Sequence, residues 1–172
     1  MVSLRAARPE DAEAIREVVA QAFPTTDEAS LVAELRADGD LLLEWVAEDE
    51  GRIVGMIQYS LLILERDGVT EDGRAAALAP VAVLPVHQGQ GIGSWLIRAT
   101  LDELKTDPWM DAIVVLGHAD YYPRFGFSTE AAARGLIDPF DAGPAFMAME
   151  LSPGGLAEPK ARPIYARAFD LG

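Results

Sequence analysis

Residues 84–94 read LPVHQGQGIGS, and this stretch decides the fold because of what stands on either side of it. The apolar run AAALAPVAVL, residues 75–84, comes before it and is typical of a buried strand. The segment WLIRATLDELK, residues 95–105, follows with the spacing of an amphipathic helix. A glycine-rich turn between a strand and a helix aims backbone N–H groups at an anion. The sequence therefore predicts a strand, an anion-binding turn, and a helix over about 91–105.

The spacing of the three glycines distinguishes among the possible anions. A P-loop would close with Gly-Lys-Ser or Gly-Lys-Thr, but Ser94 directly follows Gly93 and no lysine is present. A dinucleotide-binding fingerprint, G-x-G-x-x-G, starts at neither Gly89 nor Gly91. Both of these phosphate-binding motifs are excluded by spacing. A plain strand-to-helix turn is the remaining simple explanation, although it rarely needs three glycines within so few residues.

What remains is Gln88-x-x-Gly91-x-Gly93, in the stretch VAVLPVHQGQGIGSWLI. It resembles the Q/R-x-x-G-x-G/A motif of the GNAT superfamily of N-acetyltransferases. The resemblance implies that the turn binds the pyrophosphate of acetyl-CoA and that the backbone of the preceding strand pairs with the pantetheine arm. It also implies that a backbone amide of that strand polarises the thioester carbonyl. The predicted cofactor-binding residues are Val81, Ala82, Val83, Gln88, Gly89, Gln90, Gly91, Ile92, Gly93 and Ser94. Core packing explains the two valine side chains equally well.

A second motif, YYPRFGF at residues 121–127, resembles the GNAT signature in which a tyrosine stands four residues before a Gly-Phe pair. The resemblance implies that Tyr122 points at the CoA sulfur, with Tyr121 as the alternative if the turn is rotated. A phenol has an ordinary pKa of about 10 and a thiol one of about 8.5, so the phenol is protonated at pH 7 and can protonate or hydrogen-bond the departing sulfur. Packing in the core explains both tyrosines equally well, and Phe125 and Phe127 are expected there.

The general base is the least defined part of the site. An alkylammonium substrate has a pKa of about 10 and must lose a proton before it attacks. His118, at the end of a predicted strand at 112–117, is our candidate because histidine titrates near pH 7. A surface or capping role explains this histidine equally well, and Asp120 and Glu65 are alternative bases. His87 is expected to face phosphate or solvent.

The remaining elements follow from the periodicity of apolar residues. Strands 75–84 and 112–117 flank a helix, so they should be parallel, and Pro80 predicts a bulge or an edge. The other predicted elements are a strand at 2–8, helices at 9–23 and 27–37 with Asp27 as N-cap, strands at 41–48 and 52–64 joined by DEGR, a polar turn at 66–74, a short irregular or helical piece at 118–125, and strands in FGFST and AFMAMEL.

Together with the resemblance, this order implies an α/β fold of the α+β type, the GNAT fold, with a mixed central sheet of about six or seven strands and about four flanking helices. The connection GHADYYPRFGF lacks the Asn that many GNAT members carry, as in a compact bacterial subgroup of predicted acetyltransferases. We expect one domain over residues 1–172, in which residues 152–172 form a packed tail that contains proline and glycine.

The amino-acid composition limits the classes of ligand and binding partner to be expected. The chain has 28 acidic and 14 basic residues and a net charge of −14, which disfavours nucleic acid and anionic membranes and favours a cationic substrate. An acidic surface also simply promotes solubility. Cysteine is absent, which excludes disulfides and a cysteine-linked intermediate, and the presence of only two histidines argues against a zinc site. Without a signal peptide or an apolar stretch of membrane-spanning length, a cytoplasmic location is the simplest interpretation.

The predicted function is acetyl-CoA-dependent transfer of an acetyl group to a primary amine by direct nucleophilic attack, without a metal. The acceptor is expected to be a cationic small-molecule or peptide amine, and the protein a monomer or homodimer. The alternatives are a catalytically weak acyl-CoA-binding regulatory module and a site for another phosphate ligand such as a nucleotide. Asp27 and Glu28 are candidates for contacting a cation, and Arg98 or Arg124 for assisting the phosphate site.

Overall fold

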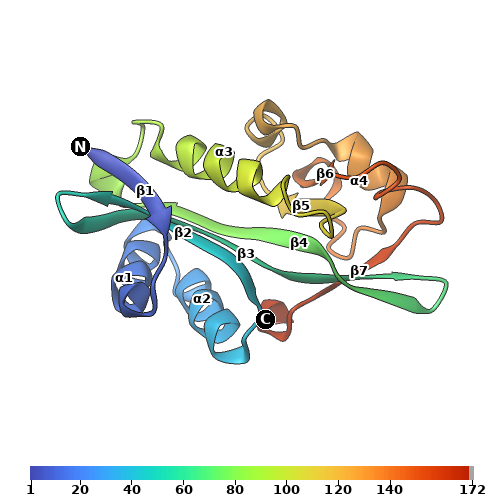
Figure 1. Ribbon diagram of the computed structural model, residues 1–172, viewed down its shortest axis with the longest axis horizontal. Helices are drawn as coiled ribbons and strands as arrows, with labels where there is room; N and C mark the ends of the chain where they lie inside the picture. Colours follow the sequence, from blue (N-terminus) through green and yellow to red (C-terminus); the bar gives the residue numbers. More distant parts are fainter. Residues whose placement is uncertain (171–172) are drawn as a thin grey trace. The chain divides into compact units, whose positions relative to one another are not determined.

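The chain forms a mixed β-sheet with four α-helices, and a computed structural model describes its residues 1–170, with the backbone alone at Asp72 and Gly73 (Figure 1). The strands are β1 (Val2–Ala6), β2 (Leu41–Asp49), β3 (Arg52–Arg66), β4 (Val69–Val83), β5 (Ala112–Leu116), β6 (Phe146–Glu150) and β7 (Arg162–Tyr165). The α-helices within residues 1–170 are α1 (Ala12–Ala22), α2 (Asp27–Asp38), α3 (Ile92–Leu104) and α4 (Thr129–Gly135). Short 3-10 helices are η1 (Pro9–Asp11), η2 (Pro85–His87), η3 (Tyr122–Phe125), η4 (Gly143–Ala145) and η5 (Arg167–Asp170).

The strand order is β1-β2-β3-β4-β5-β6, and β7 pairs with β3. Strands β4 and β5 are parallel, whereas the pairs β1–β2, β2–β3, β3–β7 and β5–β6 are antiparallel. The mixed sheet and the predicted parallel pair are therefore confirmed. None of the helices in the described part of the chain is long and apolar enough to cross a membrane.

The chain divides into two compact units, and the long strands β3 and β4 contribute residues to both. Unit 1 contains Met1–Ser60, Ala79–Asp102 and the residues from Arg167 onward. Unit 2 contains Leu61–Leu78 and Glu103–Ala166. Each unit carries one of the two motifs that the sequence singles out, the glycine turn in unit 1 and the tyrosine motif in unit 2.

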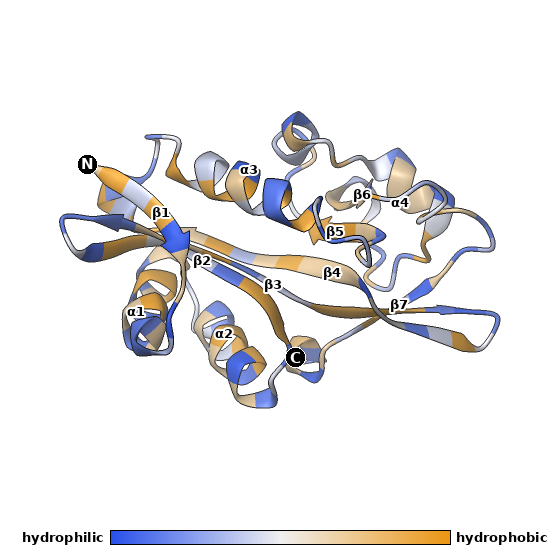
Figure 2. Ribbon diagram, viewed as in Figure 1, coloured by the Kyte–Doolittle hydropathy of each residue, from blue (hydrophilic) through white to orange (hydrophobic). Residues whose placement is uncertain are grey.

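In unit 1, helices α1 and α2 cover one face of strands β1–β3, and α3 lies on the other face (Figure 1). The β2–β3 hairpin turns at Glu50 and Gly51, whose φ values of 50° and 79° suit a two-residue turn, as the DEGR signal predicted. Hydrophilic residues mark this tip, while hydrophobic residues run along the strands (Figure 2). The last described element of the unit, η5, contacts α2, because the Arg167 guanidinium forms ion pairs with Glu34 at 2.7 Å and Asp38 at 2.8 Å.

In unit 2, the turn predicted over 66–74 is present, but it is far shorter than predicted because strands occupy most of that stretch. Strand β3 continues to Arg66, and only Asp67 and Gly68, with φ values of 50° and 78°, form the turn into β4. Aspartate and glycine adopt this conformation readily, so two residues suffice. The Arg66 guanidinium bonds both carboxylate oxygens of Glu71 at 2.8 Å and stabilises the polar end of the hairpin.

The predicted strand FGFST is wrong. Only Ser128 bridges to Ala148 of β6, and β6 itself pairs with β5. Ser128 is the N-cap of α4, because its hydroxyl oxygen accepts a 3.0 Å hydrogen bond from the Ala131 amide. Within the predicted tail, residues Arg162–Tyr165 form β7 against Leu62–Glu65 of β3.

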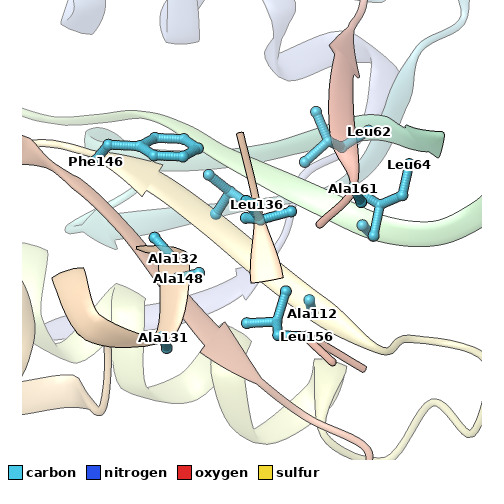
Figure 3. Packing of buried hydrophobic residues seen from close by; sticks show 12 residues of the cluster. Leu62, Leu64, Ala112, Ala131, Ala132, Leu136, Phe146, Ala148, Leu156 and Ala161 are labelled. Carbon is cyan, nitrogen blue, oxygen red and sulfur yellow. The ribbon is translucent and has the colours of Figure 1, made fainter. Parts of the chain in front are cut away.

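The core of unit 2 is rich in alanine (Figure 3). Small residues also let the end of α4 and the segment after residue 152 approach each other closely. At Gly135, for example, a β-carbon would stand 2.4 Å from the Leu156 carbonyl oxygen. The buried cluster consists of Leu62, Leu64, Ala75, Ala112, Val114, Ala131, Ala132, Leu136, Phe146, Ala148, Leu156 and Ala161.

Pro80 lies just beyond the part of β4 that pairs with β5. The ladder between β4 and β5 runs from Ala75 to Leu78, and the Ala79–Pro80 peptide bond is cis. A proline has no N–H to donate to a ladder, so its position past the last pair agrees with the expected edge.

Candidate functional site

The glycine turn joins the end of β4 to the start of α3 in unit 1. Residues 85–87 form η2, and the chain then turns through Gly89 and Gly91, with φ values of 78° and 84°. These angles favour glycine, and a β-carbon at either position would meet nothing within 4 Å. The glycines are therefore required by backbone conformation, and the space beside them is open.

Helix α3 begins at Ile92, directly after this turn. The first amides of an α-helix have no acceptor within the helix, and the helix dipole adds positive potential there. Thirteen residues of helix stand behind the turn, and Gln88, Gln90 and Gly91 are at its partly or fully exposed surface. This donor set fits a phosphate or pyrophosphate group.

Gln88 is held against its own strand. Its side-chain Nε2 donates a 2.9 Å hydrogen bond to the carbonyl oxygen of Val83. The Leu84 amide donates to the Val54 carbonyl at 2.8 Å, which anchors the end of β4 to β3. The side chain of Gln88 therefore shapes the turn from within.

His87 does not lie as expected from the sequence. Its side chain is 21% exposed, and its Nε2 stands 3.8 Å from Oδ2 of Asp49, at the end of β2. Within residues 1–170, its buried Nδ1 has no hydrogen-bond partner. The imidazole thus faces the β2–β3 hairpin, and the expectation that it faces phosphate or solvent was wrong.

The three predicted residues of β4 differ in burial. Ala82 is 3% exposed, whereas Val81 and Val83 are half-buried. The β4–β5 ladder includes none of the three, since it ends at Leu78. Their backbone lies past that ladder, which is where the family resemblance requires a strand that can pair with an extended ligand.

Gly55 of β3 is a contributor that sequence reasoning missed. A β-carbon there would stand 3.2 Å from Cγ2 of Ile92 and 3.4 Å from the Ala82 carbonyl oxygen. The missing side chain lets the first residue of α3 pack close to β3 and β4. The available signal was a glycine inside an otherwise apolar strand, which often marks a close approach.

Tyr122 begins η3 in unit 2, and its ring is surrounded by aromatic side chains. Its centroid lies 5.2 Å from that of Tyr121 and 5.9 Å from that of Phe127, both edge to face. Burial, with a smaller contribution from Tyr121, raises the pKa of Tyr122 to about 12. The phenol therefore keeps its proton at neutral pH more firmly than an ordinary tyrosine does.

Tyr121 and Arg124 form a separate pair. The Arg124 guanidinium lies 4.6 Å from the centroid of the Tyr121 ring, and its Nε donates to the Tyr121 carbonyl at 2.9 Å. Arg124 is thus tied to its own turn, where it stabilises the conformation of η3.

The three candidate bases are all in unit 2, and their surroundings differ. His118 lies just after β5, and its carbonyl oxygen accepts hydrogen bonds from the amides of Tyr121 and Tyr122, at 3.1 and 3.3 Å. Glu65 is ion-paired with Arg162 at 2.9 Å. Asp120 is exposed. Glu65 is therefore the least available of the three.

At the start of α2, the predicted N-cap Asp27 is instead the first helical residue, and Thr26 is the N-cap, so that prediction was wrong. The Thr25 hydroxyl donates to Glu28 at 3.3 Å. Asp27 and Glu28 line a cavity of about 150 Å³ together with Leu31, Ala168 and Phe169. Among the residues that the structure describes, no group of His, Cys, Asp and Glu side chains is arranged to hold a metal ion.

Comparison with known proteins identifies similar sequences and structures. The family model described as "Acetyltransferase (GNAT) domain" matches residues 43–129. The uncharacterized N-acetyltransferase YjhQ of Escherichia coli K12 is 39% identical over 132 residues, which are 76% of this chain and 71% of YjhQ.

Two solved structures resemble the whole chain. The GNAT family N-acetyltransferase YhbS of Escherichia coli in complex with CoA has a TM-score of 0.87 and 31% identity, and the match covers 99% of this chain and 93% of that one. A GNAT family acetyltransferase of Brucella melitensis in complex with acetyl-CoA has a TM-score of 0.80 and 32% identity, with 99% of each chain covered.

Proposed function

We propose that this chain, which belongs to the GNAT superfamily of N-acetyltransferases, transfers the acetyl group of acetyl-CoA to a primary amine by direct attack. The observation that carries the proposal is the pair of left-handed glycines, Gly89 and Gly91, directly before α3. That geometry suits a pyrophosphate, and two similar solved proteins hold CoA or acetyl-CoA.

In this proposal, the backbone of residues 88–94 binds the pyrophosphate, and Gln88 holds the turn in shape through Val83. The backbone of Val81, Ala82 and Val83 aligns the pantetheine arm, and one amide of this strand stabilises negative charge on the thioester oxygen. Most of the binding is thus assigned to backbone groups, which carry no net charge. A chain with a net charge of −14 can bind a polyanion in this way.

The acetyl thioester supplies an activated carbonyl carbon. The amine nitrogen attacks that carbon, the C–N bond forms as the C–S bond breaks, the nitrogen loses a proton, and the sulfur ends as a thiol. We assign to Tyr122 the role of stabilising the CoA sulfur as it leaves. With a pKa of about 12, against about 8.5 for a thiol, the phenol is the weaker acid. It therefore stabilises the developing thiolate chiefly by donating a hydrogen bond, and solvent can supply the final proton.

We assign to His118 the role of general base, which removes the proton from the ammonium group of the substrate. His118 lies at the end of β5 and carries no ion pair within the described residues. Glu65 is disfavoured because Arg162 neutralises it, and Asp120 remains a second choice. The net charge of −14 favours a cationic acceptor, a small-molecule or peptide amine. Residues 1–172 are proposed to act as a single acetyltransferase domain, as a monomer or homodimer.

The test is thiol release from acetyl-CoA, followed with a thiol reagent across polyamines, amino acids, aminoglycosides and peptides with free N-termini. We expect turnover with at least one amine class. Tyr122→Phe should lower kcat on the order of 100-fold while CoA still raises the Tm.

Two outcomes would contradict the proposal. Tight CoA binding with no turnover across the panel would indicate an acyl-CoA-binding regulatory module. Stabilisation by ATP or NAD, but not by acetyl-CoA, would indicate a nucleotide site.

A further inference from the structure

Gly117, the first residue after β5, is packed against the ring of Tyr122. A β-carbon built on Gly117 would stand 2.4 Å from Cε2 of Tyr122 and 2.9 Å from Cδ2. Gly117 does not have a positive φ, unlike Gly126 at the end of η3, so its backbone conformation is open to alanine. Glycine is thus required at position 117 for space rather than for conformation.

Three aromatic side chains lie around the Tyr122 ring and limit its movement. Buried Phe125 and Phe127 lie at centroid distances of 6.3 and 5.9 Å, and Tyr121 contacts it edge to face. The backbone on both sides is also fixed. The Gly117 amide donates to the Ala145 carbonyl at 3.0 Å, and the Tyr122 amide donates to the His118 carbonyl at 3.3 Å.

A methyl group at position 117 would therefore be accommodated mainly by displacing the Tyr122 ring. Carbon atoms in contact lie about 3.5 Å apart, so the ring must shift by roughly 1 Å from its present place. The phenolic oxygen lies at the far end of this ring and moves with it. A hydrogen bond to a reacting atom tolerates little change in distance or angle.

The geometry points to Gly117 as a positioning residue that sets the place of the Tyr122 hydroxyl, an inference that rests on the proposed role of Tyr122 at the leaving sulfur. Gly117 itself contacts no substrate in this inference. It acts by leaving the space beside its Cα to the ring, and Tyr121, Phe125 and Phe127 lie around that ring.

A double-mutant cycle tests this inference, with Gly117→Ala, Tyr122→Phe and the double variant. Gly117→Ala should lower kcat on the order of 100-fold, as a misplacement of about 1 Å can, with little change in the KM for acetyl-CoA. In the Tyr122→Phe background the ring is still displaced, but there is no hydroxyl to misplace. The double variant should therefore be no slower than Tyr122→Phe alone.

The outcomes separate the two proposals. If Gly117→Ala slows the Tyr122→Phe variant as much as it slows the native protein, or leaves kcat within about twofold, the positioning inference is wrong. If Tyr122→Phe keeps native kcat, the assignment of Tyr122 itself fails, and the inference fails with it. A slow Tyr122→Phe with a fast Gly117→Ala rejects only the inference.

Two variants guard against a general folding effect. Gly135→Ala introduces a β-carbon equally close to its nearest neighbour, 2.4 Å from the Leu156 carbonyl oxygen, in the same unit but against backbone atoms rather than the Tyr122 ring. It should lower the Tm but not kcat per folded enzyme. If Gly117→Ala does not fold, Gly117→Ala is combined with Phe127→Leu, which removes an aromatic ring 5.9 Å from that of Tyr122. This variant should fold and remain slow, and native kcat in it would overturn the inference.

Discussion

The side chain of Gln88 bonds the carbonyl oxygen of Val83, five residues earlier, over 2.9 Å, and so closes the glycine turn onto the end of its own strand. The polar residue that begins the motif therefore does not reach outward to an anion. It fixes the path of the chain, and the backbone after it becomes the anion-binding surface.

Replacing Gln88 by Ala should remove one hydrogen bond of about 1 kcal/mol and raise the KM for acetyl-CoA roughly fivefold, with kcat unchanged. Gln88→Glu should raise KM further, because a carboxylate cannot donate to the Val83 carbonyl and repels phosphate. Steady-state kinetics with varied acetyl-CoA measure both effects. Equal KM values in the native protein and Gln88→Ala would show that this bond does not shape the turn.

Gly91→Ala should weaken acetyl-CoA binding about tenfold, because an L-residue at a φ of 84° costs about 1–2 kcal/mol and the turn will relax. Calorimetric titration with CoA measures the change in Kd. Gly39→Ala is the matched control, since Gly39 ends α2 with a φ of 75° and also has nothing within 4 Å of its added β-carbon. The control should lose similar stability but keep its Kd, and a parallel loss of CoA affinity in both variants would contradict the prediction.

The pH dependence follows from the raised pKa of Tyr122. The protonated phenol is the active form, so its contribution is present below its pKa and is lost as the pH rises through about 12. The fall in kcat at alkaline pH that is caused by ionisation of Tyr122 should therefore occur about two pH units higher than for an ordinary tyrosine. A difference titration of tyrosinate absorbance, native protein minus Tyr122→Phe, measures this pKa directly. A difference that titrates near pH 10 would contradict the prediction.

The charge of Asp111, just before β5, should make the stability of unit 2 depend on pH in the acidic range. Burial alone would raise its pKa, but hydrogen bonds from Arg74 and Ser152, each with a shortest distance of 2.5 Å, outweigh burial and lower it. A carboxyl group whose folded pKa is lowered stabilises the fold above its ordinary pKa, and this stability is lost as the pH falls through the lowered value.

Asp111→Asn should therefore lower the free energy of unfolding by about 1–3 kcal/mol at pH 7, and the difference should shrink as the pH falls below about 4. Urea unfolding of the native protein and the variant, at neutral and at acidic pH, measures this difference in the free energy of unfolding. Asp67→Asn is the control, because asparagine suits the turn at Asp67, where φ is 50°, as well as aspartate does. A pH-independent difference for Asp111→Asn would mean that its charge is not what stabilises the fold.

The periodic segments of the fold were predictable, and the errors have specific causes. Helices α1 and α3 carry clear apolar periodicity, and the predicted boundaries of α1, α2, α3, β2 and β5 agree with the structure within a few residues. The turn at 66–74 was predicted too long because polar strand ends lack that periodicity, although Asp67-Gly68 is itself a hairpin signal. FGFST alternates like a strand, but the N-cap Ser128 and the alanines after it favour α4.

The candidate site was predictable where it depends on spacing along the chain. The positive φ values at Gly89 and Gly91 follow from the motif. The roles of Gly55 and Gly117 do not, because each is defined by a contact with another element, Ile92 of α3 in one case and the Tyr122 ring in the other. Spacing also does not determine where a side chain points, which is why the contact of His87 with Asp49 was not anticipated.

Arg167, which bonds Glu34 and Asp38 of α2, has a consequence for biosynthesis. Domains usually fold from the N-terminal end while the ribosome is still at work. Here, the unit that contains the N-terminus also needs β4, α3 and finally Arg167, whereas all of unit 2 precedes that residue. The order of translation is therefore not the order of completion. The ion pairs of Arg167 with α2 can therefore form only after every residue of unit 2 has been synthesised.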